Sequence, residues 1–200
     1  MTIIIFFGNG SSYSEAVFDQ LIFRDLVPIT AAIPFYGKSI DQNHNTGIVL
    51  DSPDLPFVTK LRYYGCKVIW APAHDNEALF DELQSTLYDY LIVACWPYLL
   101  KPILYRLVKR RALNLHPSLL PLFPGPDPIG EQLKSAAKIS GVTIHQLNEC
   151  FDQGPVLLQA RYNPDKGNFS LPMVEKEAGT LAGDLVVDFI KNESGALYSA

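Results

Sequence analysis

Short apolar runs alternate along the chain with longer segments in which apolar and polar residues recur at helical spacing. The apolar runs predict strands, because a strand that is covered on both faces of a sheet is apolar throughout. The predicted strands are residues 2–7, 27–33, 67–70, 91–94, 112–115, 142–147 and 155–162. The predicted helices are residues 13–24, 57–64, 76–88, a short helix from Pro102, residues 128–139 and residues 171–190.

Strands that alternate with helices predict an α/β domain with a Rossmann-like, doubly wound and mainly parallel sheet. The 200 residues fit one domain over residues 1–200, and its last helix covers about residues 171–190. Residues 34–56 contain several prolines and glycines and predict a loop; whether it forms a lid stays open. Ligands of such sheets bind beyond the carboxyl ends of the strands, which directs attention to the loops there.

Composition and charge narrow the class of protein. Hydrophobic residues make up 48% of the chain and charged residues 18%, enough to fill a core. The net charge of -5 argues against nucleic acid or a membrane surface as partner, and we interpret the cationic run at residues 109–111 as a solvated helix end. The sequence begins without a signal-peptide pattern, and no apolar run approaches the roughly 18 residues of a membrane span. We therefore expect a cytoplasmic protein.

Three cysteines, Cys66, Cys95 and Cys150, are odd in number and lack the spacing of a metal site. We interpret them as reduced and mostly packed thiols. We expect no bound metal.

The loop after the first predicted strand reads Gly8-Asn9-Gly10-Ser11-Ser12 and leads into a helix. Its glycines let the backbone approach a ligand, and the free N–H groups of a helix start suit an anion such as phosphate. A tight turn with a serine N-cap explains the same residues equally well, so both interpretations stay open.

Polar side chains follow the predicted strand at residues 112–115. Asn114 and His116 point to the same face, because side chains alternate along a strand. An amide and an imidazole side by side suit the oxyanion of an acyl transfer, although a structural histidine is the competing interpretation. His145 is a further candidate for this pocket. Asp152 would favour the charged form of His116 if the two meet, or would otherwise only cap its own turn.

Trp96, Pro97, Tyr98, Leu99 and Leu100 follow the predicted strand at residues 91–94. Such side chains can line a slot for a flat heterocycle. Core packing explains them nearly as well.

Together these loops resemble the folate-dependent formyltransferase family. Residues 114–121, Asn-Leu-His-Pro-Ser-Leu-Leu-Pro, followed by Pro124-Gly125, are similar to that family's Asn-x-His-Pro-Ser-Leu-Leu-Pro motif. Residues 141–145, Gly-Val-Thr-Ile-His, and residues 152–155, Asp-Gln-Gly-Pro, follow at the family's distances. The resemblance covers nearly the whole chain, is strongest over residues 94–161, and implies the formyltransferase fold.

The resemblance implies transfer of the formyl group of 10-formyltetrahydrofolate to a primary amine of a small-molecule acceptor, without a metal. By this likeness Asn114 and His116, as imidazolium, stabilise the oxyanion, while Asp152 keeps His116 charged and accepts the amine proton. The folate would lie between Trp96, Pro97, Tyr98, Leu99 and Leu100 on one side and Asn148, Glu149, Cys150 and Phe151 on the other. The acceptor would meet Gly8, Asn9, Gly10, Ser11, Ser12, Ser118, Gly125 and His145.

The expected acceptor is most like glycinamide ribonucleotide, a phosphorylated amine, because the length and the residues 8–11 resemble the purine-pathway members. Three departures weaken that assignment: Asp127-Pro128-Ile129 replaces a His-x-His stretch, Gly179 aligns near an acceptor-binding glutamate, and Tyr98 stands where an arginine is usual. Amino-sugar and methionyl-tRNA-type formyltransferases, a formyltetrahydrofolate hydrolase and a non-catalytic folate-binding relative therefore stay open. A monomer and a homodimer stay open as well.

Overall fold

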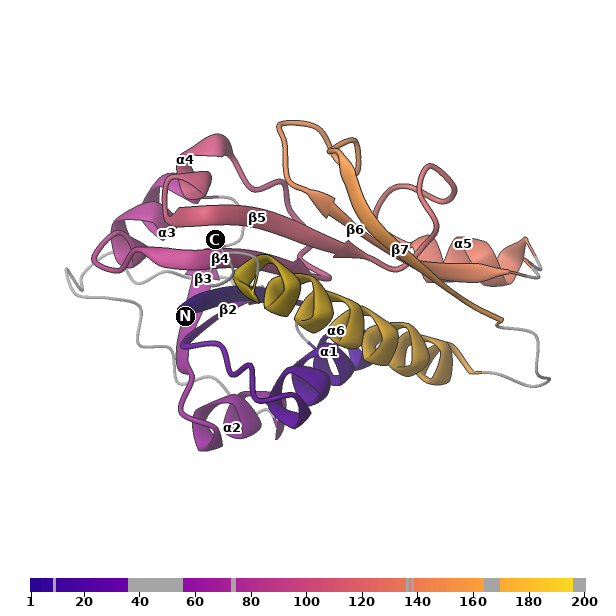
Figure 1. The fold of residues 1–200 in the computed structure, drawn as a ribbon, viewed down its shortest axis with the longest axis horizontal. Coiled ribbons are helices and arrows are strands. Elements are labelled where there is room, and N and C mark those ends of the chain that lie inside the picture. Colours follow the sequence, from indigo (N-terminus) through magenta and orange to yellow (C-terminus); the bar gives the residue numbers. More distant parts are fainter. Residues whose placement is uncertain are drawn as a thin grey trace.

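The computed structural model describes residues 1–8, 10–35, 56–72, 75–135, 137, 139–163 and 170–195. These residues form a seven-stranded sheet of order β3-β2-β1-β4-β5-β6-β7 (Figure 1). The strands are β1 (Ile3–Phe7), β2 (Thr30–Phe35), β3 (Lys67–Pro72), β4 (Tyr88–Ala94), β5 (Val108–His116), β6 (Ser140–Gln146) and β7 (Val156–Tyr162). The helices are α1 (Ser12–Phe23), α2 (Pro56–Tyr63), α3 (Asn76–Leu83), α4 (Pro102–Tyr105), α5 (Pro128–Lys134) and α6 (Leu171–Gly195).

The sheet changes direction at one pair of strands. β1 to β5 pair in parallel, whereas β6 is antiparallel to β5 and β7 is antiparallel to β6. The mainly parallel, doubly wound α/β fold is therefore confirmed.

Both faces of the sheet are buried, as the continuous apolar strands predicted. In β1, Ile3, Ile5 and Phe7 pack with α1, α2 and α6 on one face, while Ile4 and Phe6 pack with α3 and α4 on the other. All five side chains are at most 1% exposed. Figure 1 shows α1 and α6 side by side beneath the sheet.

Several predicted boundaries are wrong. The second strand begins at Thr30 instead of residue 27, and α3 ends at Leu83 because the chain enters β4 at Tyr88. α5 ends at Lys134, and α6 continues beyond residue 190 to Gly195. The predicted loop at residues 34–56 lies largely outside the described residues.

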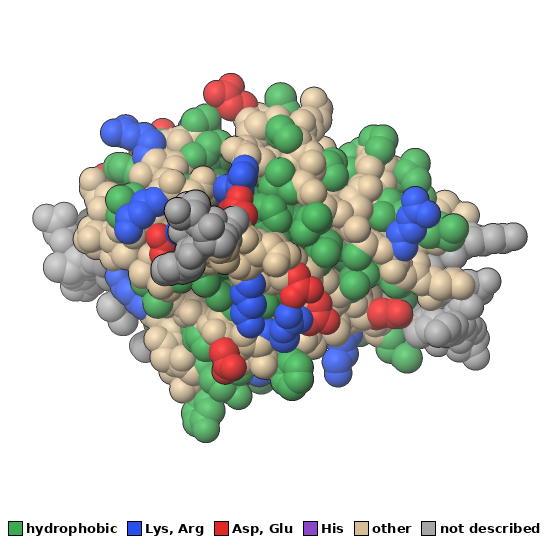
Figure 2. Space-filling view, in the orientation of Figure 1, with side chains coloured by type: hydrophobic (Ala, Val, Ile, Leu, Met, Phe, Trp, Pro, Cys, Tyr) green, Lys and Arg blue, Asp and Glu red, His purple; other side chains and the backbone are tan. Residues whose placement is uncertain are grey.

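The prediction that the cationic run at residues 109–111 is a solvated helix end is also wrong, because these residues lie in β5. Arg111 forms an ion pair with Glu193 of α6 and donates to Gln146 of β6 at 3.1 Å. The run thus lies near the start of β5, and Arg111 connects this strand to α6 and β6. On the face shown in Figure 2, basic and acidic side chains are interspersed.

The cysteines are all free, but the expectation that they are mostly packed is wrong. Cys66 is buried, whereas Cys95 and Cys150 are exposed. Burial raises the pKa of the Cys66 thiol to about 11. None of the described helices is long and apolar enough to cross a membrane. Among the described residues, no group of three or more His, Cys, Asp or Glu could hold a metal ion.

Helices α1 and α6 touch closely because α6 presents two glycines one turn apart. A Cβ at Gly179 would lie 2.4 Å from the carbonyl oxygen of Tyr13, and a Cβ at Gly183 would lie 3.0 Å from that of Val17. Both glycines are buried. Glycine is required here because any larger side chain would force the helices apart.

We expect Gly179→Ala to lower the free energy of unfolding by about 1–2 kcal/mol, because the added methyl overpacks this contact. The direction of this change tests the packing, because Gly→Ala at an exposed position of a helix raises the free energy of unfolding by roughly 1 kcal/mol. Urea denaturation of this variant beside Lys176→Ala, which changes an exposed residue of the same helix, measures the effect. A stabilised Gly179→Ala variant would contradict the packing described.

Candidate active site

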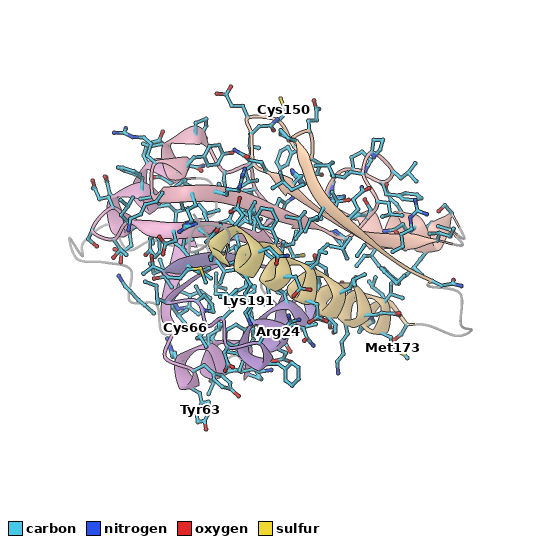
Figure 3. The ribbon with its side chains drawn as sticks, viewed as in Figure 1. Arg24, Tyr63, Cys66, Cys150, Met173 and Lys191 are labelled. Carbon is cyan, nitrogen blue, oxygen red and sulfur yellow. The ribbon has the colours of Figure 1, made fainter. Side chains whose placement is uncertain are left out.

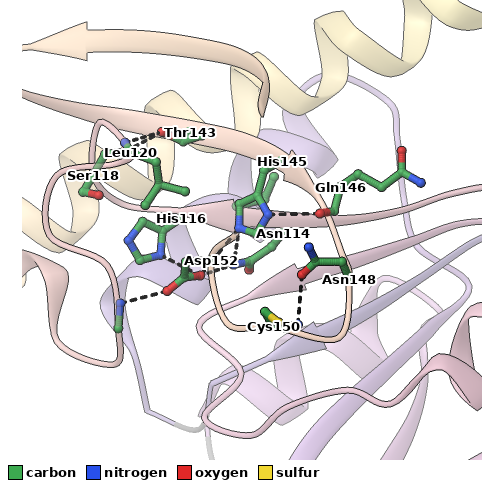
Figure 4. Close-up of polar contacts among 12 residues, drawn as sticks. Asn114, His116, Ser118, Leu120, Thr143, His145, Gln146, Asn148, Cys150 and Asp152 are labelled. Atoms are coloured by element: carbon green, nitrogen blue, oxygen red, sulfur yellow. Dashed lines mark hydrogen bonds and ion pairs between the residues drawn. The ribbon is translucent and has the colours of Figure 1, made fainter. Parts of the chain in front are cut away.

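A buried carboxylate lies at the centre of the polar cluster beyond the end of β5 (Figure 4). The Asp152 side chain is 7% exposed, and its Oδ2 accepts the backbone N–H of Gly125 at 2.8 Å. Its Oδ1 accepts Nδ2 of Asn114 at 3.2 Å. The same oxygen lies 3.4 Å from Nδ1 of His116 and 3.5 Å from Nε2 of His145. The structure thus brings together four side chains that the sequence singled out separately.

Strand register places these groups opposite one another. Asn114 of β5 pairs with His145 of β6, and Nδ2 of Asn114 lies 3.0 Å from Nε2 of that ring. His116 pairs two positions further along, opposite Thr143. Because side chains alternate along a strand, Asn114 and His116 share one face of the sheet.

A tight return of the chain after β6 brings Asp152 back to this face. A Cβ at Gly154 would lie 1.6 Å from the carbonyl oxygen of Gln146, so only glycine allows the close approach. Asp152 itself has a φ of 53°, a left-handed backbone conformation that is costly for a residue with a side chain. Such strain persists only where surrounding contacts hold it, and here the carboxylate supplies them.

His116 is held from both sides by oxygen atoms. Its Nε2 lies 2.9 Å from the carbonyl oxygen of Phe123, and its Nδ1 faces Asp152. Ser118 fixes the loop that carries this carbonyl, since its hydroxyl donates to Leu122 at 2.6 Å and to Phe123 at 3.3 Å. Ser118 therefore stabilises the loop whose carbonyl group positions His116.

The charges of the cluster follow from burial and from its hydrogen bonds. Burial lowers the pKa of His116 below its ordinary value, and the nearby Asp152 carboxylate and Phe123 carbonyl offset this only in part. Burial alone would raise the pKa of Asp152, but His145, His116 and the Gly125 N–H outweigh it and hold that pKa below its usual range. Asp152 thus acts against the effect of burial on His116. That Asp152 keeps His116 charged stays a prediction.

A cavity of about 520 Å³ opens beside the cluster. Its lining includes Trp96, Pro97, Tyr98, Leu99 and Leu100 from the segment after β4, and Asn148, Cys150 and Phe151 from the segment after β6. Asn114, His116, His145 and Asp152 form its polar end, and Gly8, Ser11 and Gly125 also line it. Glu149, Gly10, Ser12 and Ser118 are not among the lining residues, and Asn9 lies outside the described part of the chain.

The first loop caps α1, as one of the two interpretations proposed. The Ser11 hydroxyl accepts the N–H of Ser14 at 3.3 Å, which is a serine N-cap. Gly8 is required for packing, because a Cβ there would lie 2.6 Å from the carbonyl oxygen of Cys95. Whether the loop also holds an acceptor stays a prediction.

Some residues of the cavity were not anticipated from the sequence. Pro126, Pro128 and Leu147 line it, and Phe123 contributes only a carbonyl group. Prolines beside a glycine are typical of a turn, but the path of such a turn depends on contacts with distant strands. No local pattern could have assigned these residues.

Comparisons with known proteins agree with the geometry. The model of the formyl transferase family matches residues 2–172, and the chain belongs to this family. The chain is 36% identical over 124 residues to the methionyl-tRNA formyltransferase of Thermotoga neapolitana, a match that covers 62% of this chain and 39% of that protein. It is 31% identical over 99 residues to the phosphoribosylglycinamide formyltransferase of Bacillus subtilis, covering 47% and 51%. It is 34% identical over 92 residues to the formyltetrahydrofolate deformylase of Haemophilus influenzae, covering 46% and 33%.

The chain thus matches about half or less of the length of each of these three relatives. Among solved structures, the phosphoribosylglycinamide formyltransferase of Streptococcus pneumoniae TIGR4 superposes with a TM-score of 0.70 at 21% identity. That superposition covers 96% of this chain and 98% of the other, and it shows a shared fold.

We expect Asp152→Asn to lower the pKa of His116 further, because the variant removes a negative charge that now raises it. A pH titration of the imidazole signals by NMR measures the shift. Asp81→Asn, which changes an exposed carboxylate of α3, should leave the His116 titration as it is. An unchanged pKa of His116 in Asp152→Asn would show that the two groups are not electrostatically coupled.

Proposed function

We propose that this protein transfers the formyl group of 10-formyltetrahydrofolate to a primary amine of a small acceptor. The observation that carries the proposal is the convergence of Asn114, His116 and Asp152 at the polar end of an apolar cavity. Membership of the formyl transferase family supports the reaction class.

The cavity suits a folate donor. Two aromatic rings and two leucines from one segment and Phe151 from another line it, which fits a flat heterocycle held between apolar surfaces. We infer that Trp96–Leu100, Asn148, Cys150 and Phe151 hold the donor. When bound, 10-formyltetrahydrofolate supplies an activated formyl group, so no enzyme nucleophile is needed.

In the proposed reaction Asn114 and His116 stabilise the negative charge that forms on the formyl oxygen during acyl transfer. The Nδ2 group of Asn114 has two hydrogens and lies within reach of both Asp152 and His145. In the proposed reaction one of these hydrogens is donated to the formyl oxygen, while the bond to Asp152 keeps the amide in place.

The Asp152–His116 pair would accept the proton that the attacking amine loses. Both ring nitrogens of His116 face oxygen atoms, an arrangement that accommodates the protonated ring. Negative charge on the nearby formyl oxygen would raise the pKa of His116, so the pair can accept one proton. The same pair can return this proton to the departing nitrogen of the donor.

The acceptor is a separate part of the proposal, because the three relatives differ in the names they carry. The alternatives drawn from the sequence correspond to four formyl acceptors: glycinamide ribonucleotide, an amino sugar, methionyl-tRNA and water. A small amine is the proposed class, and glycinamide ribonucleotide is the first acceptor to assay. The single domain, the cytoplasmic location and the choice between monomer and homodimer stay predictions.

We expect purified protein to release tetrahydrofolate from 10-formyltetrahydrofolate only when an acceptor amine is present, as followed by absorbance. Asp152→Asn should lower kcat by about 100-fold or more, because it removes the proton acceptor, while the donor still binds. Asp81→Asn is the matched control and should keep full activity. Release without an acceptor would identify a hydrolase instead, and full activity of Asp152→Asn would refute the assignment of that residue.

A further inference from the structure

Two segments without regular secondary structure contribute much of the lining of the cavity. One segment follows β4 and contains Trp96–Leu100, and the other follows β6 and contains Asn148, Cys150 and Phe151. The backbone groups of such segments are not paired in a helix or a strand, so other groups must bind them. The shape of the cavity therefore depends on the side chains that hold these two segments in place.

Asn76, the first residue of α3, holds the segment after β4 at its end. This asparagine is buried, with 4% of its surface exposed. Its Oδ1 accepts the N–H of Lys101 at 2.8 Å, and its Nδ2 donates to the carbonyl oxygen of Leu99 at 3.5 Å. A side-chain amide offers both a donor and an acceptor, so one residue can bind two backbone groups. Both of these contacts belong to the same segment.

Tyr105, the last residue of α4, contacts both segments instead of one. Its hydroxyl oxygen lies 2.7 Å from the carbonyl oxygen of Leu100 and 2.9 Å from that of Asn148. Leu100 and Asn148 both line the cavity. A hydroxyl group has one hydrogen, so the two carbonyl groups share it. The hydroxyl of Tyr105 thus joins the segment after β4 to the segment after β6.

The ring of Tyr105 is anchored in the core. It packs against the cluster on the face of the sheet that carries Ile4 and Phe6, and its neighbour Leu104 is fully buried. Burial, followed by the charge of Glu149, raises the pKa of Tyr105 to about 12. The hydroxyl therefore keeps its hydrogen at neutral pH and can donate it to either carbonyl group.

We propose that Tyr105 is a positioning residue for the formyl donor, because its hydroxyl fixes the two cavity-lining segments relative to one another before the donor binds. A site that is ordered in advance binds more tightly than one whose loops must be ordered on binding. Tyr105 is not among the described residues that line the cavity, so it acts through Leu100 and Asn148. The term donor rests on the proposed formyl transfer, whereas the link between the two segments does not.

Tyr105→Phe tests the proposal, because it removes the hydroxyl and keeps the ring that packs in the core. We expect the variant to bind tetrahydrofolate about three- to tenfold more weakly, the change that corresponds to one lost hydrogen bond. Tryptophan fluorescence follows the binding, since Trp96 lines the cavity. The KM for the donor should rise by the same factor, while kcat stays within about twofold, because Asn114, His116 and Asp152 are unchanged. A purely structural role of Tyr105 would not divide the effect between KM and kcat in this way.

Backbone 15N relaxation measures the link between the segments without any ligand. In Tyr105→Phe the amides of residues 99–101 and of residues 148–150 should both become more mobile, because both segments lose the shared hydroxyl. Asn76→Ala removes contacts of the segment after β4 alone, so it should mobilise residues 99–101 and leave residues 148–150 as they are.

Tyr63→Phe is the matched control for the loss of a tyrosine hydroxyl. Tyr63 is 82% exposed, and Figure 3 shows it on the opposite side of the molecule from Cys150 of the cavity lining. This control should bind tetrahydrofolate and relax as the wild type does. Thermal unfolding of each variant confirms that it is folded.

Three results would overturn the proposal. In Tyr105→Phe both segments could keep the mobility of the wild type, or only one of them could become more mobile. The wild type and Tyr105→Phe could also bind tetrahydrofolate equally tightly. A wild type that does not bind tetrahydrofolate at all would instead refute formyl transfer, and with it the role of Tyr105 toward the donor, while the relaxation data alone would decide whether Tyr105 joins the segments.

Discussion

The site depends on one buried negative charge, the carboxylate of Asp152. Removing a carboxylate from water costs roughly several kcal/mol unless hydrogen bonds and opposite charges compensate. Here Gly125 and Asn114 donate to it, and two imidazoles lie within 3.5 Å. The positions of all four groups relative to one another are therefore coupled through this carboxylate.

The reversal of direction in the sheet makes this convergence possible. In the parallel part of the sheet, β4 and β5 end at the same edge. The segment after β4 carries Trp96–Leu100, and the end of β5 carries Asn114 and His116. The antiparallel pairing of β5 with β6 then sets His145 directly opposite Asn114. The return after β6 brings Asp152 to the same place, and Gly154 permits its tight path. The sheet thus holds Asn114, His116 and His145, while loops supply Asp152 and much of the lining of the cavity.

Much of this arrangement could be predicted from the sequence, where the information was local. The continuous apolar runs identified the strands, and the resemblance of residues 114–121 and 152–155 to the motifs of a known family pointed to Asn114, His116 and Asp152. Spacing alone did not show that these side chains meet. Local patterns failed where a distant contact decides the outcome. The basic residues 109–111 lie in a strand because β5 pairs with β4 along that length, and Ser118 supports a loop because it reaches Phe123. The lowered pKa of His116 follows from burial, which spacing does not reveal.

The central claim is that the polar cluster and the apolar cavity form one site for a folate. A crystal structure of the protein with tetrahydrofolate tests it most directly. The account predicts that the pteridine ring lies between Trp96–Leu100 and Phe151, with the formyl-bearing nitrogen directed at Asn114, His116 and Asp152. A ring bound elsewhere, or one whose reactive nitrogen faces away from these three side chains, would contradict the account.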